Sequence, residues 1–197
     1  MCIRDRENGV EVHFPKDAKA GGTWIAASND HRLVCVLNGA FVKHKHEPPY
    51  RLSRGIMALE FFEYSSAIDF FENYDFEGIE PFTLIVVEQG NLFDFRWDEK
   101  EVHLQMLDNQ ESHIWSSCPL YPPEMQKKRQ QVFYDWLAGQ NEISKEDILD
   151  LHLNGGVGDP ENDFVMNRMN IVRTVSITSV AYENGGFSME FNDLMES

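Results

Sequence analysis

The sequence has no long apolar run and few residues that could cross-link it. No window approaches the 18 or more consecutive apolar residues that a membrane-spanning helix needs. The three cysteines, Cys2, Cys35 and Cys118, are odd in number and widely spaced, so neither a disulfide framework nor a paired-cysteine zinc site is expected. The first residues lack the basic and apolar regions of a secretion signal. We therefore expect a soluble, cytoplasmic protein with reduced thiols.

Positive charge is also scarce. The chain has 17 Lys and Arg residues against 33 Asp and Glu residues, which gives a formal net charge of −16. Such a surface repels phosphate backbones and anionic membranes, so nucleic acid is not an expected partner. We expect a small-molecule substrate or ligand instead, with no membrane span and no assigned oligomeric state.

The chain has 197 residues, of which 42% are hydrophobic and 12% aromatic. This length and composition are enough for one domain with a hydrophobic core. Two apolar runs joined by Ser28-Asn29-Asp30-His31 predict a hairpin, and a meander of three strands follows Pro81. Helical spacing after Gly55 predicts two helices separated at Ser65-Ser66, the second capped by one of these serines. The sequence therefore predicts an α+β protein with an antiparallel sheet and helices in separate layers.

The second half continues this pattern. A short strand is expected to end at Ser116, and a helix with one apolar face is expected to end at Gly139. Ser144 and Asp147 have the spacing of a capping box for a further helix. A closing hairpin is predicted with its turn at 184–186.

Several side chains could carry chemistry. Cys2 would be exposed as a nucleophile on removal of Met1, with its own α-amine as base, although a second residue of no significance is the commoner case. Asn38 could donate to an oxyanion, or simply form a turn with Gly39. Arg173 enters a strand-like run, where it could anchor a carboxylate or lie at a strand edge. Cys35 is expected to be a small, buried apolar residue. No cation or helix N-terminus is predicted near Cys118, so a lowered pKa of its thiol is not expected.

Two segments invite a metal interpretation, and for both we favour a solvated surface loop. In "HKHE", His44 and His46 lie on one side of an extended segment beside Glu47, but Lys43 and Lys45 share that loop. In "GDPENDFVMN" the oxygen ligands do not have the spacing of a calcium-binding EF-hand loop; they are Asp159, Glu161, Asn162 and Asp163. We therefore predict no metal site and no resident cofactor.

Five stretches in a familiar order resemble the NRDE family, the proteins related to transport and Golgi organisation protein 2, and its bacterial branch in particular. They are "GGTWIAAS", "LVCVLNGA", "PPYRLSRG", "EPFTLIVVE" and "RTVSITSV". The resemblance covers about residues 7–191. It implies an αββα sandwich like that of the N-terminal nucleophile hydrolases, here incomplete at its N-terminus.

The resemblance also implies roles. Cys2 would be the nucleophile, Asn38 and Ser117 the oxyanion donors, and Arg173 a residue of the substrate pocket, for hydrolysis of a non-peptide amide. Ser117 stands where an asparagine is expected and is a more rotatable donor. The alternative that the resemblance implies is a haem- or lipid-handling protein without catalysis. Its candidate haem ligands are His44, His46, His103, His113 and His152.

The N-terminus departs from the family. "MCIRDR" runs directly into "ENGVEVHFP", without most of the expected strand and without the Asn-Arg-Asp-Glu loop that names the family. Residues 1–6 are expected to be a non-native leader of the kind left by sequencing-adapter read-through in metagenomic genes, and residues 7–197 a single domain. The chain as given is therefore expected to be inactive as an enzyme.

Overall fold

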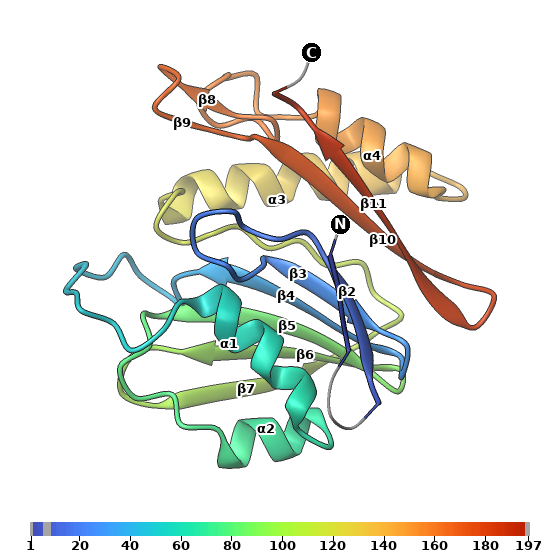
Figure 1. The fold of residues 1–197 in the computed structure, drawn as a ribbon. Helices are drawn as coiled ribbons and strands as arrows, with labels where there is room; N and C mark the ends of the chain where they lie inside the picture. Colours follow the sequence, from blue (N-terminus) through green and yellow to red (C-terminus); the bar gives the residue numbers. More distant parts are fainter. Residues whose placement is uncertain (1, 6–8, 196–197) are drawn as a thin grey trace.

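The computed structural model describes residues 9–195 and the backbone of residues 2–5. The chain is an α+β protein (Figure 1). Its strands are β1 Cys2–Asp5, β2 Glu11–Phe14, β3 Ile25–Ser28, β4 Arg32–Asn38, β5 Phe82–Glu88, β6 Asn91–Trp97, β7 Val102–Leu107, β8 Asn167–Arg168, β9 Val172–Arg173, β10 Ser176–Glu183 and β11 Gly186–Asp193. Its helices are α1 Arg54–Glu60, α2 Ala67–Asn73, α3 Pro123–Ala138 and α4 Lys145–Asn154, with a 3-10 turn at Phe61–Glu63.

The main sheet contains β1 to β7, antiparallel throughout and in chain order. The β3–β4 hairpin pairs Ile25 with Cys35, and β4 pairs with β5 over its whole length, ending with Asn38 opposite Phe82. Both the predicted hairpin and the predicted meander β5–β6–β7 are confirmed. The apolar and β-branched content of these runs explains why they form strands.

Helix ends follow the predicted capping residues. The Ser66 hydroxyl accepts a hydrogen bond from the Asp69 amide at the start of α2. Ser144 and Asp147 form a complete capping box at the start of α4, and α3 ends at Gly139. Each cap satisfies backbone groups that the helix cannot pair internally.

The core lies between the helices α1 and α2 and one face of the main sheet. It is rich in phenylalanine, and Phe71 of α2 stacks on Phe95 of β6 with ring centroids 4.3 Å apart. Fully buried rings such as Phe61, Phe70 and Phe82 fill the same layer. Aromatic burial of this extent is the main stabilising contribution to the fold.

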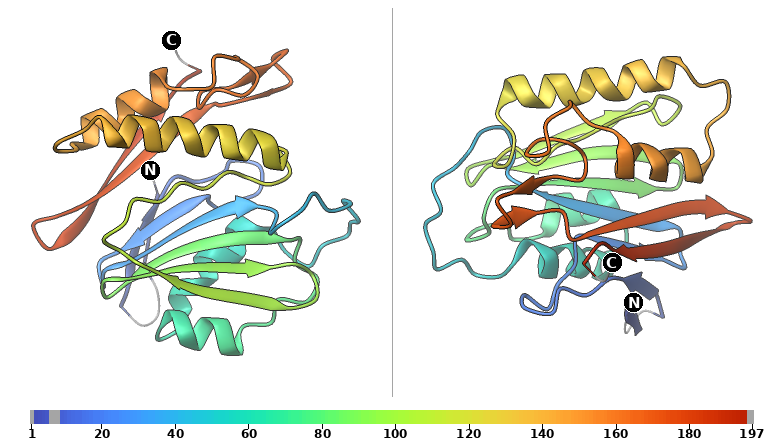
Figure 2. Two further views of the ribbon diagram at one scale, coloured as in Figure 1. Left: turned by 180° about the vertical axis from the view of Figure 1, so that it is seen from behind. Right: turned by 90° about the horizontal axis from the view of Figure 1, so that it is seen from above.

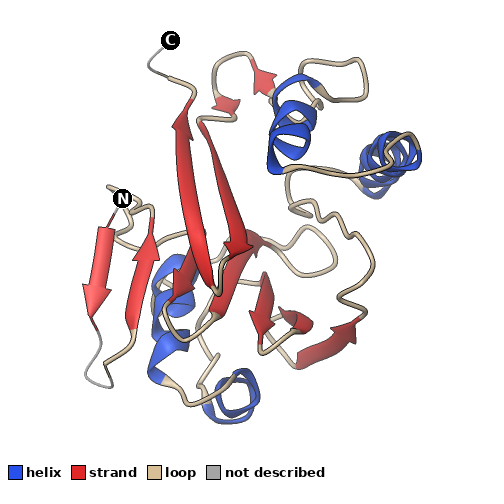
Figure 3. Cartoon of the chain, turned by 90° about the vertical axis from the view of Figure 1, so that its right-hand side faces the viewer, coloured by secondary structure: helices blue, strands red, loops and turns tan. Residues whose placement is uncertain are grey.

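The other face of the main sheet is covered differently. The β10–β11 hairpin, α3 and α4 all lie on this side (Figures 2 and 3). The indole nitrogen of Trp24 donates to the Thr178 hydroxyl (3.1 Å) and Lys145 pairs with Glu190 (2.6 Å), joining the hairpin to the sheet and to α4. The predicted α+β class is therefore confirmed, and β10 and β11 form a separate two-stranded antiparallel sheet.

Two predictions about the second half need correction. No strand ends at Ser116: residues 112–117 belong to no strand and pair with no described strand. The face of α3 predicted to point inward is only half-buried, at Met125, Val132, Phe133, Trp136 and Leu137. No described strand pairs with residues 112–117, and α3 lies over the sheet without packing closely on it, which leaves its apolar face half-buried. No helix among the described residues has the length and apolar character to cross a membrane.

Candidate functional site

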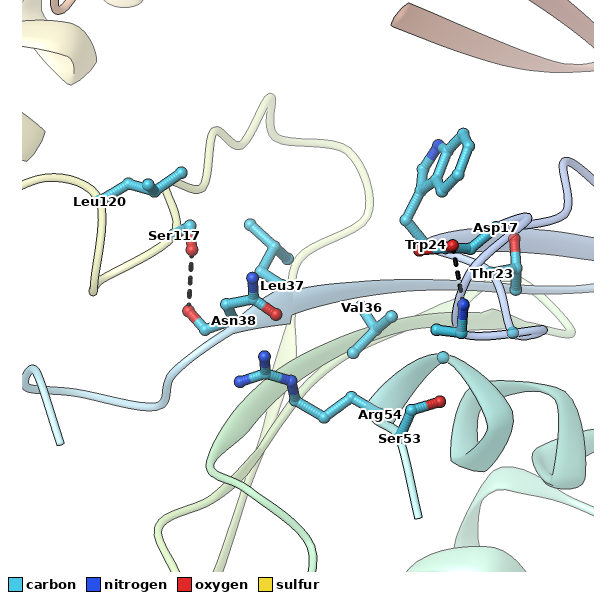
Figure 4. Close-up of a pocket in the computed structure, with 13 residues that line it drawn as sticks. Asp17, Thr23, Trp24, Val36, Leu37, Asn38, Ser53, Arg54, Ser117 and Leu120 are labelled. Atoms are coloured by element: carbon cyan, nitrogen blue, oxygen red, sulfur yellow. Dashed lines mark hydrogen bonds between the residues drawn. The ribbon is translucent and has the colours of Figure 1, made fainter. Parts of the chain in front are cut away.

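A cavity of about 460 Å³ opens at one end of the main sheet (Figure 4). The end of β4, the residues before β3, the start of α1 and the segment before α3 all contribute to its wall. Its polar and aromatic lining includes Asp17, Trp24, Asn38, Arg54 and Ser117. We refer to it as the Asn38 cavity.

Two glycines bring its walls together. The Thr23 amide donates to the Gly55 carbonyl (3.2 Å), so the chain before β3 runs against the first turn of α1. A side chain on Gly22 would overlap the backbone of Gly55, and one on Gly55 would overlap that of Thr23. The "GGTW" and "SRG" motifs are thus two halves of one backbone contact.

The structure brings Asn38 and Ser117 together. The Ser117 hydroxyl donates to the Asn38 main-chain carbonyl (2.9 Å), and both residues line the Asn38 cavity. No described residue hydrogen-bonds the Asn38 side-chain amide, which leaves its N–H groups available to a ligand. The Ser117 hydroxyl, by contrast, already uses its proton on Asn38.

Arg54 reaches the same cavity from α1. Its guanidinium pairs with Glu80 (2.9 Å) and donates to the Pro81 carbonyl (3.0 Å). Burial lowers the pKa of Arg54, and the carboxylate of Glu80 opposes that shift. The side chain is held in one position by these contacts, so it can present a fixed N–H edge to a bound molecule.

Arg173 is not placed in this cavity. It lies on the two-residue strand β9, where it is exposed, and it is absent from the cavity wall. β9 pairs with the equally short β8, which follows the loop after α4.

The backbone of Cys2 also lies away from Asn38. Cys2 is in β1 at the edge of the main sheet, paired with Phe14 of β2. β2 and β3 separate it from β4, so about 14 Å of sheet lies between the strands that carry Cys2 and Asn38. Met1 and residues 6–8 lie outside the described residues, and the predicted boundary between a leader and a domain stays a prediction.

Neither of the other two cysteines has the properties of a nucleophile. Burial raises the pKa of the Cys35 thiol to about 11. Burial also raises the pKa of Cys118, although the nearby Arg96 opposes the shift, and its thiol contacts the Val42 carbonyl. A thiol that is protonated near neutral pH is a weak nucleophile.

A second cavity, of about 430 Å³, lies between the open face of the main sheet and the helices α3 and α4. Its wall is mostly apolar, with Ile85 on the sheet and Trp115, Phe133, Trp136 and Ile148 above it. We refer to it as the α3–α4 cavity. The sequence showed an apolar face on α3 but gave no sign that this face borders a space.

Two histidines also line the α3–α4 cavity: His113, before α3, and His152, on α4. His113 Nε2 bonds to the Asp108 carbonyl (2.8 Å), and His152 Nδ1 bonds to the Ile148 carbonyl (2.9 Å). Because a carbonyl oxygen can only accept a hydrogen bond, each of these nitrogens carries a proton and donates it. The other ring nitrogen of each histidine can then act as an acceptor or a metal ligand.

The two segments with possible metal ligands behave differently. In the acidic loop, one oxygen of Asp163 accepts from the amides of Gly158 and Asp159, and Asp159 accepts from that of Glu161. These carboxylates are turn-forming groups, as expected for a surface loop. In "HKHE", both imidazoles contact Glu80, and Glu47 contacts Lys45 instead.

Comparison with known proteins identifies a family. A family model described as Transport and Golgi organisation 2 matches residues 3–168. The match includes the motifs that build the Asn38 cavity and the helices over the α3–α4 cavity. No curated protein matches the chain.

Proposed function

The chain belongs to the Transport and Golgi organisation 2 family, and on that premise we propose that it binds an apolar ligand, a haem or an acyl lipid, in the α3–α4 cavity. The observation that carries this proposal is an apolar space bordered by two histidines. Ligand sites are typically concave and mostly apolar, with a few polar groups that fix orientation. This cavity has that composition.

The cavity wall is compatible with a haem. Flat aromatic groups, Trp115 and Trp136, are the kind of surface that packs against a porphyrin, and His113 and His152 each keep one ring nitrogen that would be able to bind iron. These two histidines would hold the iron, which would supply the redox and ligand-binding chemistry of the group. The half-buried face of α3 supports the same view, because a ligand would complete its burial.

A hemin titration of the tag-free chain tests this proposal. The expected result is a saturable shift of the Soret band at about one equivalent. His113→Gln and His152→Gln should each weaken binding or change the spectrum, while His103→Gln on the far sheet edge should not. A fluorescent fatty acid in place of hemin tests the lipid arm, where the two histidine variants should have little effect.

The cysteines provide a control within one chain. Cys35 lines the α3–α4 cavity and Cys118 does not. A ligand bound there should slow alkylation of Cys35 and leave that of Cys118 unchanged. Equal protection of both thiols, or no saturable binding of either probe, would reject the proposal.

A second candidate function has support from the Asn38 cavity. In a cysteine amidohydrolase from which Met1 has been removed, the α-amine of Cys2 would take the thiol proton as the sulfur attacks the amide carbonyl carbon, and the Asn38 amide would stabilise the oxyanion. The C–N bond would then break, the α-ammonium would give its proton to the leaving amine, and water would hydrolyse the thioester to release the acid and the thiol. The Asn38 side-chain amide, which has no hydrogen-bond partner among the described residues, supports this chemistry, whereas the Ser117 hydroxyl already donates to the Asn38 carbonyl. The separation of β1 from β4 opposes it, so we propose that this chain as given does not turn over a substrate.

A panel of small non-peptide amides separates the two candidates. Wild-type chain and Cys2→Ala should show the same absence of product above background. Product formation that is lost in both Cys2→Ala and Asn38→Ala would establish the hydrolase instead. Binding of hemin by a chain that fails this assay supports the first candidate alone.

A further inference from the structure

The outer edge of β7 is open, and a cavity adjoins it at one end. β7 is the last strand of the main sheet, and no described strand or loop hydrogen-bonds the outer side of its backbone (Figure 1). A cavity of about 540 Å³, which neither candidate function uses, lies at the start of this strand; we refer to it as the Trp97 cavity. We propose that the edge and the Trp97 cavity together bind an extended peptide segment of a partner protein, with apolar side chains at alternate positions and an arginine or lysine after them.

β7 presents a row of apolar side chains to solvent. Val102, Leu104 and Met106 are 39%, 45% and 67% exposed. Alternate residues of a strand point to the same face of the sheet, so these three side chains lie side by side. Leu104 pairs with Phe95, whose ring stacks on α2, so the row is on the face that α1 and α2 cover. The helices therefore bury β6 but leave this row of β7 uncovered.

The edge also lacks the features that usually prevent a further strand from pairing. Such features are lysine or proline on the edge strand, or a bulge that twists it away. The sequence of β7, "VHLQML", has no lysine and no proline, and the strand pairs with β6 residue for residue. An extended peptide can therefore add to this edge through main-chain hydrogen bonds, while pockets for its alternate side chains give specificity.

Two aromatic rings form part of the wall of the Trp97 cavity, and a hydrogen bond fixes each of them. The indole N–H of Trp97 donates to the Ile79 carbonyl (3.0 Å), and the Tyr50 hydroxyl accepts from the Glu47 amide (2.9 Å). The face of such a ring attracts a guanidinium or ammonium group. Trp97 also pairs with Val102 across the β6–β7 ladder, so the cavity adjoins the apolar row of β7.

The charge of this cavity complements a basic side chain. Among the described residues of its wall, Glu47, Glu77 and Glu99 are acidic and Lys100 is basic. Glu47 pairs with Lys45 (2.6 Å), whereas the carboxylates of Glu77 and Glu99 are exposed and have no ion pair with the described residues. A second copy of this chain, with its net charge of −16, is a less favourable occupant because like charges repel.

The sheet direction predicts the order of residues in the partner. The main sheet is antiparallel throughout, and the Trp97 cavity lies at the start of β7. A strand that continues this pattern has its C-terminal end beside the cavity. The basic residue should therefore follow the apolar ones, two positions after the residue that lies opposite Val102. A free cation would need only the cavity, whereas this segment needs the edge as well.

Two synthetic peptides of equal composition test the proposal by fluorescence anisotropy with the tag-free full chain. The fluorescein-labelled peptide VTVTVTR should bind saturably. Its isomer TVTVTVR places the valines on the opposite side when the arginine is in the cavity, so it should bind about tenfold more weakly. Hydrogen exchange of the β7 amides should slow when VTVTVTR is bound, because the added strand covers this edge.

Variants of exposed side chains locate the site. Glu99→Gln and Met106→Gln should each weaken binding of VTVTVTR by about 2- to 5-fold. The matched controls Glu142→Gln, in the loop before α4, and Met169→Gln, in the turn between β8 and β9, replace exposed residues of the same types and should leave it unchanged.

A charge reversal gives a result that loss of folding cannot imitate. Glu99→Lys should bind the peptide VTVTVTE more tightly than the wild-type chain does. Equal binding of the two isomeric peptides, or equal binding of VTVTVTR and N-acetylarginine amide, would overturn the proposal by showing that the edge is not used. A dimer that Met106→Lys abolishes, detected by sedimentation, would assign the edge to a second copy instead.

Discussion

The Ser117 hydroxyl donates a hydrogen bond to the main-chain carbonyl of Asn38, across 79 positions of sequence. This contact fixes the segment before α3 against the end of β4 and forms one wall of the Asn38 cavity. Next to it, Gly39 adopts a φ of +80° and lies against Cys118 and Pro119. This hydrogen bond and the close approach of Gly39 to the Cys118 and Pro119 side chains therefore both hold the wall in place.

Gly39→Ala should destabilise the chain more than Gly185→Ala. Both glycines have a φ of +80°, which costs an L-residue about 1 to 2 kcal/mol. A Cβ on Gly39 would also overlap Cys118 and Pro119, whereas one on Gly185 meets nothing within 4 Å. Urea unfolding of the two variants measures the difference, and equal losses would show that the wall has room to move.

Arg129→Leu should lower the free energy of unfolding by about 2 kcal/mol, the size expected for lost charged hydrogen bonds. The guanidinium is buried over Tyr121 and Phe164 and donates to the Asn162 and Asp163 carbonyls (2.7 and 2.9 Å). Hydrogen exchange of the loop after α4 should accelerate at the same time.

The matched control for that variant is Arg173→Leu. The Arg173 side chain is exposed and has no hydrogen bond with the described residues, so its replacement should change stability by no more than about 0.5 kcal/mol. A loss at Arg173 as large as at Arg129 would contradict the placement of the two side chains.

Cys35 should react slowly with iodoacetamide near pH 8 in the folded chain. With a pKa of about 11 against an ordinary 9.0, its thiolate fraction at that pH is about 100-fold lower than in the unfolded chain. Its labelling rate should rise steeply between pH 9 and 11, as peptide mapping can follow. A rate that levels off below pH 9 would show that the thiol is not buried as described.

Asp98→Asn should destabilise the chain in a pH-dependent way. The amides of Glu101 and Lys100 and the His103 ring lower the pKa of Asp98 to about 2. A carboxyl whose pKa is lower in the folded state stabilises it above the unfolded value, near 4, and loses that effect as the pH falls towards 2. The difference in urea midpoint between wild type and variant should therefore be full at pH 6 and shrink below pH 4.

Most of the local structure could be predicted from sequence because it depends on near neighbours. Alternation and β-branched content predicted the hairpin and the meander, and the serine caps predicted the starts of α2 and α4. The strand expected to end at Ser116 fails because a strand needs a partner, and no described strand pairs with that segment. A sequence pattern can favour an extended segment, but it does not show whether a neighbouring strand is there to pair with it.

The candidate sites could be predicted only in part. Asn38 and Ser117 were named from a resemblance and do meet at one cavity, whereas Arg173 from the same resemblance lies on the surface. The spacing of His44 and His46 was visible in the sequence. Their shared contact with Glu80 could not be predicted, because Glu80 lies in another segment of the chain.

The sequence by itself determined the hairpins, the meander and the starts of several helices, because periodicity and caps act within a few residues, and it also determined the family and the acidic surface. Only the tertiary structure decided that Glu80 joins two histidines to Arg54, that α3 borders an apolar space, and that the strand of Cys2 lies three positions from the strand of Asn38. These relationships depend on which faces pack together and in which strand order. That choice is made by the burial of the whole aromatic core and not by any one segment.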